Sequence, residues 1–199
     1  MEVVFPDIED LLVMPNPRMD DDWFFDFCVQ NSDLQIERTA QGEIVIIPPT
    51  GGETSNRNSE ISAQLQNWAK ADGRGRAFDS NGGFILPNGA VRAPDAAWVR
   101  KSWLEKLTKE QKRRHLPLCP DFLIELISPG DRSSRVEAKM REWIANGAEL
   151  AWMIDPDQRT VTIYRPGREP EQLMNPAFVD GEGPVAGFRL MMTEIWEGI

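Results

Sequence analysis

Residues 121–127, DFLIELI, constrain the fold more than any other part of the sequence. Apolar side chains fill both alternating faces of this segment, which is typical of a strand buried on both sides near the middle of a sheet. Glu125 interrupts the run, and a carboxylate is costly to bury unless it is paired or binds a cation. The segment therefore predicts a central strand, and we favour a functional role for Glu125 over a structural one.

Helical and extended patterns alternate around this strand. The periodicity predicts helices over residues 21–31, 58–71 and 134–145, with a basic helical stretch over 101–114 and a final turn of helix at 193–196. Ser134 and Glu137 form a possible capping box, and Gly147 is a candidate helix stop. Strands are expected near residues 34–38, 43–48, 76–79, 83–86 and 96–99, and 149–155 with 160–166 should form a hairpin, whereas 48–54 read as a turn. This order predicts an α/β fold with a mixed sheet flanked by helices.

Length and composition favour one domain spanning residues 1–199, because seven Trp and nine Phe can supply a large core. Residues 1–19 are acidic and rich in proline, and we expect them to form an irregular N-terminal arm. No secretory leader and no membrane-spanning run is apparent, so the expected location is the cytoplasm, without a membrane partner.

Several classes of chemistry find no support in the sequence. Cys28 and Cys119 are far apart and form no CxxC pair, which argues against a disulfide framework or a zinc site. His115 is the single histidine and lies in a basic stretch that we expect to be exposed, so a Ser-His-Asp or Cys-His mechanism is not favoured. Glycine-rich nucleotide-binding motifs are missing as well.

Charge is distributed unevenly along the chain. The net charge is −10, yet residues 51–148 contain 16 basic and 12 acidic side chains. This basic middle segment is weak support for a polyanionic partner, because such an excess is also common on ordinary solvated surfaces. The run 101–114 in particular is either a solvated face or a contact for phosphates.

Two carboxylates stand at positions that suit a metal site. Asp95 follows Pro94 at the entrance of the strand expected at 96–99, and Glu125 lies inside the central strand. Magnesium takes one or two carboxylates, keeps several waters and adds substrate oxygens, so neighbouring strands carrying these acids predict a Mg²⁺ site, where Mn²⁺ could substitute. The carbonyl of Leu126 is a candidate further ligand.

Two helical residues are candidate partners of these acids. Lys139 lies on the flank of an apolar helical stripe, from which it could orient water or stabilise a phosphate, and Glu60 on the earlier helix could support the metal or the water. Each has a structural alternative: Asp95 as a turn acid, Lys139 as a flank lysine and Glu60 as a solvated helix acid. Asp121 and Asp131 are assigned to structural roles.

Several separated blocks together resemble the bacterial Uma2 family, whose fold is similar to the restriction-endonuclease-like, PD-(D/E)XK superfamily. The blocks are PTGGET, ILPNGAVRAPDAAWV, PDFLIELISPGD and the WMIDP–IYRPG hairpin, and the likeness runs from about Gln30 to the C-terminus. The resemblance implies an endonuclease that cuts DNA and leaves a 5′-phosphate.

The same resemblance implies roles for individual residues. Pro94 and Asp95 match the PD of the superfamily motif, and Glu125 matches its second acid. The lysine expected two positions later is replaced by Ile127, and Lys139 on the following helix matches the place to which this family moves it. Glu60 matches the acid of the N-terminal helix.

Other interpretations remain open at this stage. A catalytically degenerate module that binds nucleic acid or protein is favoured by Ile127 and by the acidic total charge. The hydrophobic hairpin 149–166 could also form the edge of a homodimer, which would suit either function. The sequence leaves open the target sequence, DNA against RNA, and single against double strands.

Overall fold

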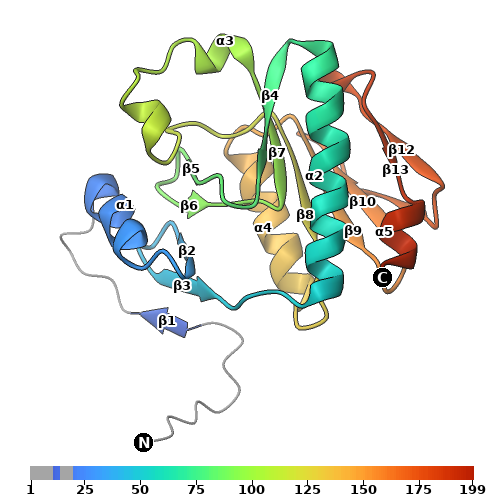
Figure 1. Ribbon diagram of the computed structural model, residues 1–199, viewed down its shortest axis with the longest axis horizontal. Coiled ribbons are helices and arrows are strands. Elements are labelled where there is room, and N and C mark those ends of the chain that lie inside the picture. Colours follow the sequence, from blue (N-terminus) through green and yellow to red (C-terminus); the bar gives the residue numbers. More distant parts are fainter. Residues whose placement is uncertain (1–10, 14–19) are drawn as a thin grey trace, which may run out of the picture.

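A six-stranded mixed sheet forms the centre of the computed structural model, which describes residues 11–13 and 20–199 (Figure 1). The strand order is β11-β10-β9-β8-β7-β4, with β8 and β9 parallel and the other neighbours antiparallel. The strands are β4 (Gly75–Asp79), β7 (Ala96–Arg100), β8 (Phe122–Leu126), β9 (Leu150–Asp155), β10 (Thr160–Tyr164) and β11 (Glu171–Met174). The α/β fold expected from the sequence is confirmed.

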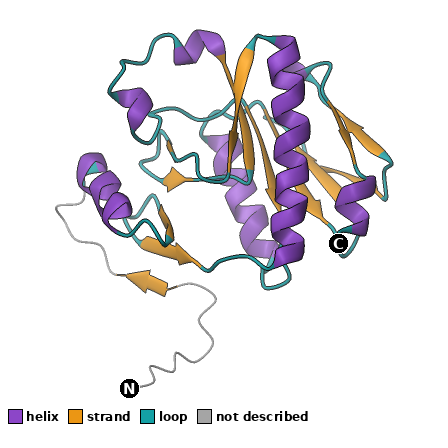
Figure 2. Cartoon of the chain, in the orientation of Figure 1, coloured by secondary structure: helices purple, strands orange, loops and turns teal. Residues whose placement is uncertain are grey.

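Two helices cover opposite faces of this sheet (Figure 2). Helix α2 (Gly52–Asp72) buries Ile61 and Leu65 in one apolar cluster, and helix α4 (Ser133–Ala145) buries Met140 and Trp143 in another. Every residue of β8 is buried, as expected for a central strand. Because side chains alternate along a strand, Phe122 and Ile124 face α2, whereas Leu123 and Glu125 face α4.

A second, antiparallel sheet packs beside the first with the order β1-β3-β2-β6-β5. Helix α1 (Asp21–Gln30) covers it through Phe24, which shares a small core with Ile44 and Val91. The strands are β1 (Leu11–Val13), β2 (Gln35–Arg38), β3 (Ile44–Ile47), β5 (Phe84–Ile85) and β6 (Val91–Arg92). The pairing of β1 with β3 means that the expected N-terminal arm is not irregular at residues 11–13; residues 1–10 and 14–19 lie outside the described part.

Short elements complete the chain. They are helix α3 (Lys101–Leu104), the 3₁₀ turns η1 (Gln111–Arg113) and η2 (Gly183–Val185), the hairpin of β12 (Phe178–Asp180) with β13 (Arg189–Met191), and helix α5 (Thr193–Glu197).

The structure corrects three local expectations about helices. Helix α2 begins at Gly52 rather than Asn58, and Glu53 in its first turn pairs with Arg57 at 2.8 Å. The capping box of Ser134 and Glu137 does not form: α4 begins one residue earlier, and among the described residues no side chain caps it. The basic stretch 101–114 is not one helix but α3 and η1 joined by turns.

Two further expectations were wrong for reasons of packing. The hairpin of β9 and β10 is not an edge, because β8 pairs with one side of it and β11 with the other. His115 is half-buried rather than exposed, because its ring lies 5.1 Å from that of Phe25 and 5.7 Å from that of Phe24.

Candidate active site

Lys139 of α4 is the centre of a polar cluster that also includes residues of β8, β2 and the segment before β7. Its Nζ lies 3.0 Å from Glu125 Oε1 on β8 and 2.9 Å from Glu37 Oε1 on β2, and it donates to the carbonyl oxygen of Ala93 at 3.3 Å. An ammonium has three donors, so each of them has an acceptor here. Burial alone would lower the pKa of Lys139, but Glu125 and Glu37 outweigh it and raise that pKa, which keeps the side chain charged.

Glu125 is held by two side chains of α4, Lys139 and Trp143. Trp143 lies one turn after Lys139 on the same helical face and donates its indole Nε1–H to Glu125 Oε1 at 2.9 Å. Burial raises the pKa of Glu125 to about 7; Lys139 works against this rise, and Asp95 and Glu37 add to it. This carboxylate is therefore one that a positive charge would stabilise further.

Asp95 joins the cluster from the residue before β7. Its Oδ2 accepts the backbone N–H of Leu126 at 2.7 Å, and its Oδ1 accepts Nδ2–H of Asn58 at 2.8 Å. Burial raises the pKa of Asp95, partly offset by the hydrogen bond from Leu126 and by the charge of Lys139. The structure thus brings together Asp95, Glu125, Lys139 and the main chain of Leu126, four of the five positions singled out in the sequence.

Glu60, the fifth position, lies elsewhere on α2. Its Oε1 accepts Nε2–H of Gln64 at 2.9 Å, and Gln64 also bonds the main chain of Met191 on β13. Because each helical residue turns by about 100°, Glu60 points away from the face that carries Asn58. The side chain of α2 that reaches Asp95 is therefore Asn58.

Glu37 is a site residue that the sequence did not reveal. Its carboxylate pairs with Lys139 and with Arg92 at 3.0 Å and accepts the backbone N–H of Ala93 at 3.0 Å, while Arg92 also pairs with Glu142 at 2.7 Å. Burial would raise the pKa of Glu37, but Lys139 and Arg92 prevail and lower it. Glu37 alternates with apolar residues along its strand, and a strand with one face in solvent shows the same pattern. The sequence therefore did not distinguish a site residue from a solvated one at this position.

The charges and oxygens of the cluster fit a hydrated divalent cation. The cluster holds four carboxyl groups (Glu37, Asp95, Glu125, Glu142) and two cations (Lys139, Arg92), so acidic groups outnumber basic ones. Within residues 11–13 and 20–199, no three Asp, Glu, His or Cys side chains form a group that could enclose a metal. Magnesium does not need such a cage, because it uses one or two carboxylates and retains water.

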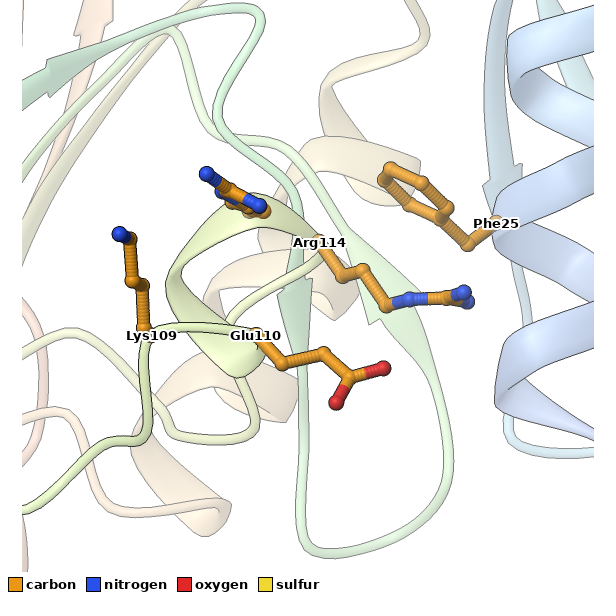
Figure 3. A pocket seen from close by; sticks show the side chains of 5 residues that line it. Phe25, Lys109, Glu110 and Arg114 are labelled. Carbon is orange, nitrogen blue, oxygen red and sulfur yellow. The ribbon is translucent and has the colours of Figure 1, made fainter.

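A separate basic hollow lies between α1 and η1 (Figure 3). It has a volume of about 480 Å³ and is lined by Phe25, Lys109, Glu110, Arg113 and Arg114. The guanidinium of Arg114 lies over the ring of Phe25 at 5.1 Å and pairs with Asp22 of α1 at 3.0 Å. None of these residues belongs to the cluster around Lys139.

Comparison with known proteins now identifies the family. Residues 21–193 match the family model Uma2, described as "Putative restriction endonuclease". The chain belongs to the Uma2 family. The match includes every residue of the cluster around Lys139, from Glu37 to Trp143. The Uma2 resemblance of the sequence is thereby confirmed.

A solved structure supports the fold of this Uma2 member. It is titled as a crystal structure of a "putative nuclease belonging to DUF820" from Anabaena variabilis, and it is 22% identical in sequence, with a TM-score of 0.69. The alignment covers 81% of this chain and 89% of that one. No curated protein matches the chain. Within the described residues, no helix has the length and apolar character needed to span a membrane.

Proposed function

We propose that this Uma2 protein is a metal-dependent endonuclease that hydrolyses phosphodiester bonds in DNA, with Mg²⁺ as cofactor and Mn²⁺ able to replace it. The observation that carries the proposal is the convergence of Asp95, Glu125 and Lys139. Glu125 lies 3.0 Å from the ammonium of Lys139, and Asp95 accepts the backbone N–H of Leu126, the residue that follows Glu125. Family membership supplies the reaction class.

Asp95 and Glu125 are the side chains that would hold the cation, together with the carbonyl of Leu126. When bound, a divalent cation lowers the pKa of an attacking water and neutralises charge that develops on the phosphate. Lys139, fixed by its three acceptors, presents a permanent positive charge that can orient the water or stabilise the phosphate in the transition state. Glu60 is left out of this assignment because Gln64 holds its carboxylate.

The departure from the superfamily motif at Ile127 does not weaken this assignment. Ile127 packs against the apolar cluster under α4. Lys139 lies on α4, the helix that follows β8, and its ammonium reaches Glu125. The positive charge is therefore present beside the acid although the lysine stands at a different position in the sequence. Such relocation keeps the charge arrangement on which the chemistry depends.

The alternative is a non-catalytic module that binds nucleic acid or protein. It is favoured by the self-contained pairing of Lys139 with Glu37 and Glu125, which satisfies these groups without a metal. The two functions differ in their response to metal: the enzyme gains thermal stability from millimolar Mg²⁺ or Mn²⁺, and the module does not.

A cleavage assay tests the proposal directly. Supercoiled plasmid and single-stranded DNA are incubated with Mg²⁺ or Mn²⁺ and the wild type, Asp95→Asn or Glu125→Gln. We expect each variant to lose about 100- to 1,000-fold in rate, since single electrostatic groups at the reacting centre contribute on this scale. Glu171→Gln, an exposed acid of β11, is the matched control and should cleave normally.

Cleavage at the wild-type rate by both site variants would refute the assignment. If the wild type itself neither cleaves DNA nor gains melting temperature from the metal, the binding module would be favoured. Cutting both strands of a duplex takes two such sites, so the proposal includes a homodimer. Light scattering measures its mass.

A further inference from the structure

Asn58 carries an unsatisfied oxygen beside the proposed cation site. Its Nδ2–H donates to Asp95 at 2.8 Å, while its Oδ1 is buried and has no hydrogen-bond partner among the described residues. A buried acceptor without a partner destabilises the folded state. An unpaired group of this kind in a native fold calls for a ligand, an ion or a water as its explanation.

The neighbours of Asn58 fix which way its amide points. A carboxylate accepts and does not donate, so Asn58 must turn Nδ2 toward Asp95 and leave Oδ1 free. Arg57, the preceding residue, anchors this turn of α2, because its Nε donates to the carbonyl of Ile195 at 2.8 Å and its Nη2 pairs with Glu53. The turn of α2 that carries Asn58 is therefore tied to α5.

The geometry places this oxygen within reach of an ion held by Asp95. The two polar atoms of an amide are at most about 2.6 Å apart, the sum of its C=O and C–N lengths. Added to the 2.8 Å hydrogen bond, this puts Asn58 Oδ1 within about 5.4 Å of Asp95 Oδ1. A divalent cation bound by Asp95 would therefore lie close enough for Asn58 Oδ1 to reach it directly or through one of the waters that such a cation retains.

We propose that Asn58 is a positioning residue of the cation site: Nδ2 fixes the orientation of Asp95, and Oδ1 serves the hydrated cation as an additional neutral oxygen donor. The inference rests on the proposed function and assigns to Asn58 the contribution of α2 that the sequence suggested for Glu60. A neutral amide suits this position because the cluster already holds more carboxylates than cations. Groups that orient a metal ligand typically contribute 10–100-fold to metal affinity.

The experiment measures Mn²⁺ binding without DNA, by the loss of the free-ion signal in electron paramagnetic resonance. Asn58→Leu removes both polar atoms at similar volume, and we expect it to weaken Mn²⁺ affinity about 10–100-fold. Its metal-free stability should change little, since removing the unsatisfied oxygen of Asn58 offsets the loss of the hydrogen bond that its amide donates to Asp95. Gln64→Leu is the matched control: it removes an amide from the same helix, one whose polar atoms are already bonded to Glu60 and Met191, and it should bind Mn²⁺ as the wild type does.

Asn58→Asp provides a second measurement if the leucine variant does not fold. It keeps an oxygen but replaces the donor to Asp95 with a negative charge, so metal-free stability should fall and the rise in melting temperature on adding Mn²⁺ should exceed that of the wild type. Asn58→Leu with wild-type Mn²⁺ affinity, an equal loss in Gln64→Leu, or an unchanged Mn²⁺ response in Asn58→Asp would overturn the inference alone. A wild type that binds no Mn²⁺ at millimolar concentration would overturn the metal-dependent function as well.

Discussion

Lys139 and the basic segment 101–114 carry the same kind of charge in opposite surroundings. The Lys139 side chain is 20% exposed and meets acceptors from β2, β8 and the chain before β7. The segment 101–114 contains six basic side chains, and Lys101, Lys106, Lys109, Lys112 and Arg113 are all exposed. A buried charge needs specific partners, whereas an exposed one is satisfied by water. The position of Lys139 is therefore informative about function, although the segment is far richer in charge.

The largest effect on stability is expected from replacing Lys139, the buried charge of this pair. Lys139→Met leaves Glu37 and Glu125 without their shared cation, and removing one partner of a buried ion pair costs about 3–5 kcal/mol. We expect a loss of that size in the free energy of unfolding, measured by urea denaturation at neutral pH. Lys109→Met, the matched change in the exposed segment, should stay within about 0.5 kcal/mol of the wild type.

Adding Glu125→Gln to Lys139→Met sharpens the result, because it removes the buried acid that has lost its cation, whereas Glu37 keeps its pair with Arg92. We expect the double variant to be more stable than Lys139→Met alone, which a double-mutant cycle would report as coupling between the two residues. A Lys139→Met protein that unfolds within about 1 kcal/mol of the wild type would mean that the network contributes no net stability.

The parts of the site that the sequence predicted share one property. Asp95, Glu125 and Lys139 each stand in a local pattern that is unusual by itself or that matches a family block: an acid opening a strand, an acid inside an apolar strand, and a lysine on the next helix. Glu37 and Asn58 stand in ordinary patterns. Their roles arise from contacts across 56 residues, to Ala93, and 37 residues, to Asp95, and such docking of separate elements leaves no local signal.

The fold shows the same division. Strand β8 and the hairpin of β9 and β10 were predicted because strands buried on both faces are long apolar runs. The start of α2 was missed because Gly51 and Gly52 are typical of a turn, although Gly51 is the N-cap and Gly52 the first helical residue. The edge of the sheet was misassigned because β11, EQLM, is short and has little hydrophobic character, so the sequence does not fix its position or its pairing with β10.

An intermediate effect on stability is expected at His115, the half-buried residue that directly follows the basic segment. Burial, and then the charge of Arg38, lower the pKa of His115, while Asp21 acts in the opposite direction. The unfolded chain therefore takes up a proton below about pH 6.5 that the folded chain does not, so this residue makes stability fall as the pH drops below that value.

His115→Phe removes this titration and the buried Nδ1, which has no partner in the described part of the chain. We expect the variant to match or exceed the wild type in stability at pH 7 and to lose less stability between pH 6.5 and 5. Urea midpoints at both pH values measure this difference. Parallel pH profiles for the two proteins would show that His115 does not titrate differently on folding.

The smallest effect is expected from substitutions in the exposed basic segment 101–114. Lys109→Glu and Arg113→Glu reverse two charges that line the hollow beside Phe25 and form no ion pair with another described residue. If the segment contacts DNA, the double variant should bind DNA a few-fold more weakly at low salt, with a salt dependence flatter by about one unit per lost phosphate contact. Stability should not change beyond about 0.5 kcal/mol, because both side chains are solvated.

Fluorescence anisotropy across a salt series measures the affinity of the double variant for DNA. Unchanged binding would make the segment a solvated surface only, and a loss of cleavage as large as that of Glu125→Gln would contradict the separation drawn between buried and exposed charge.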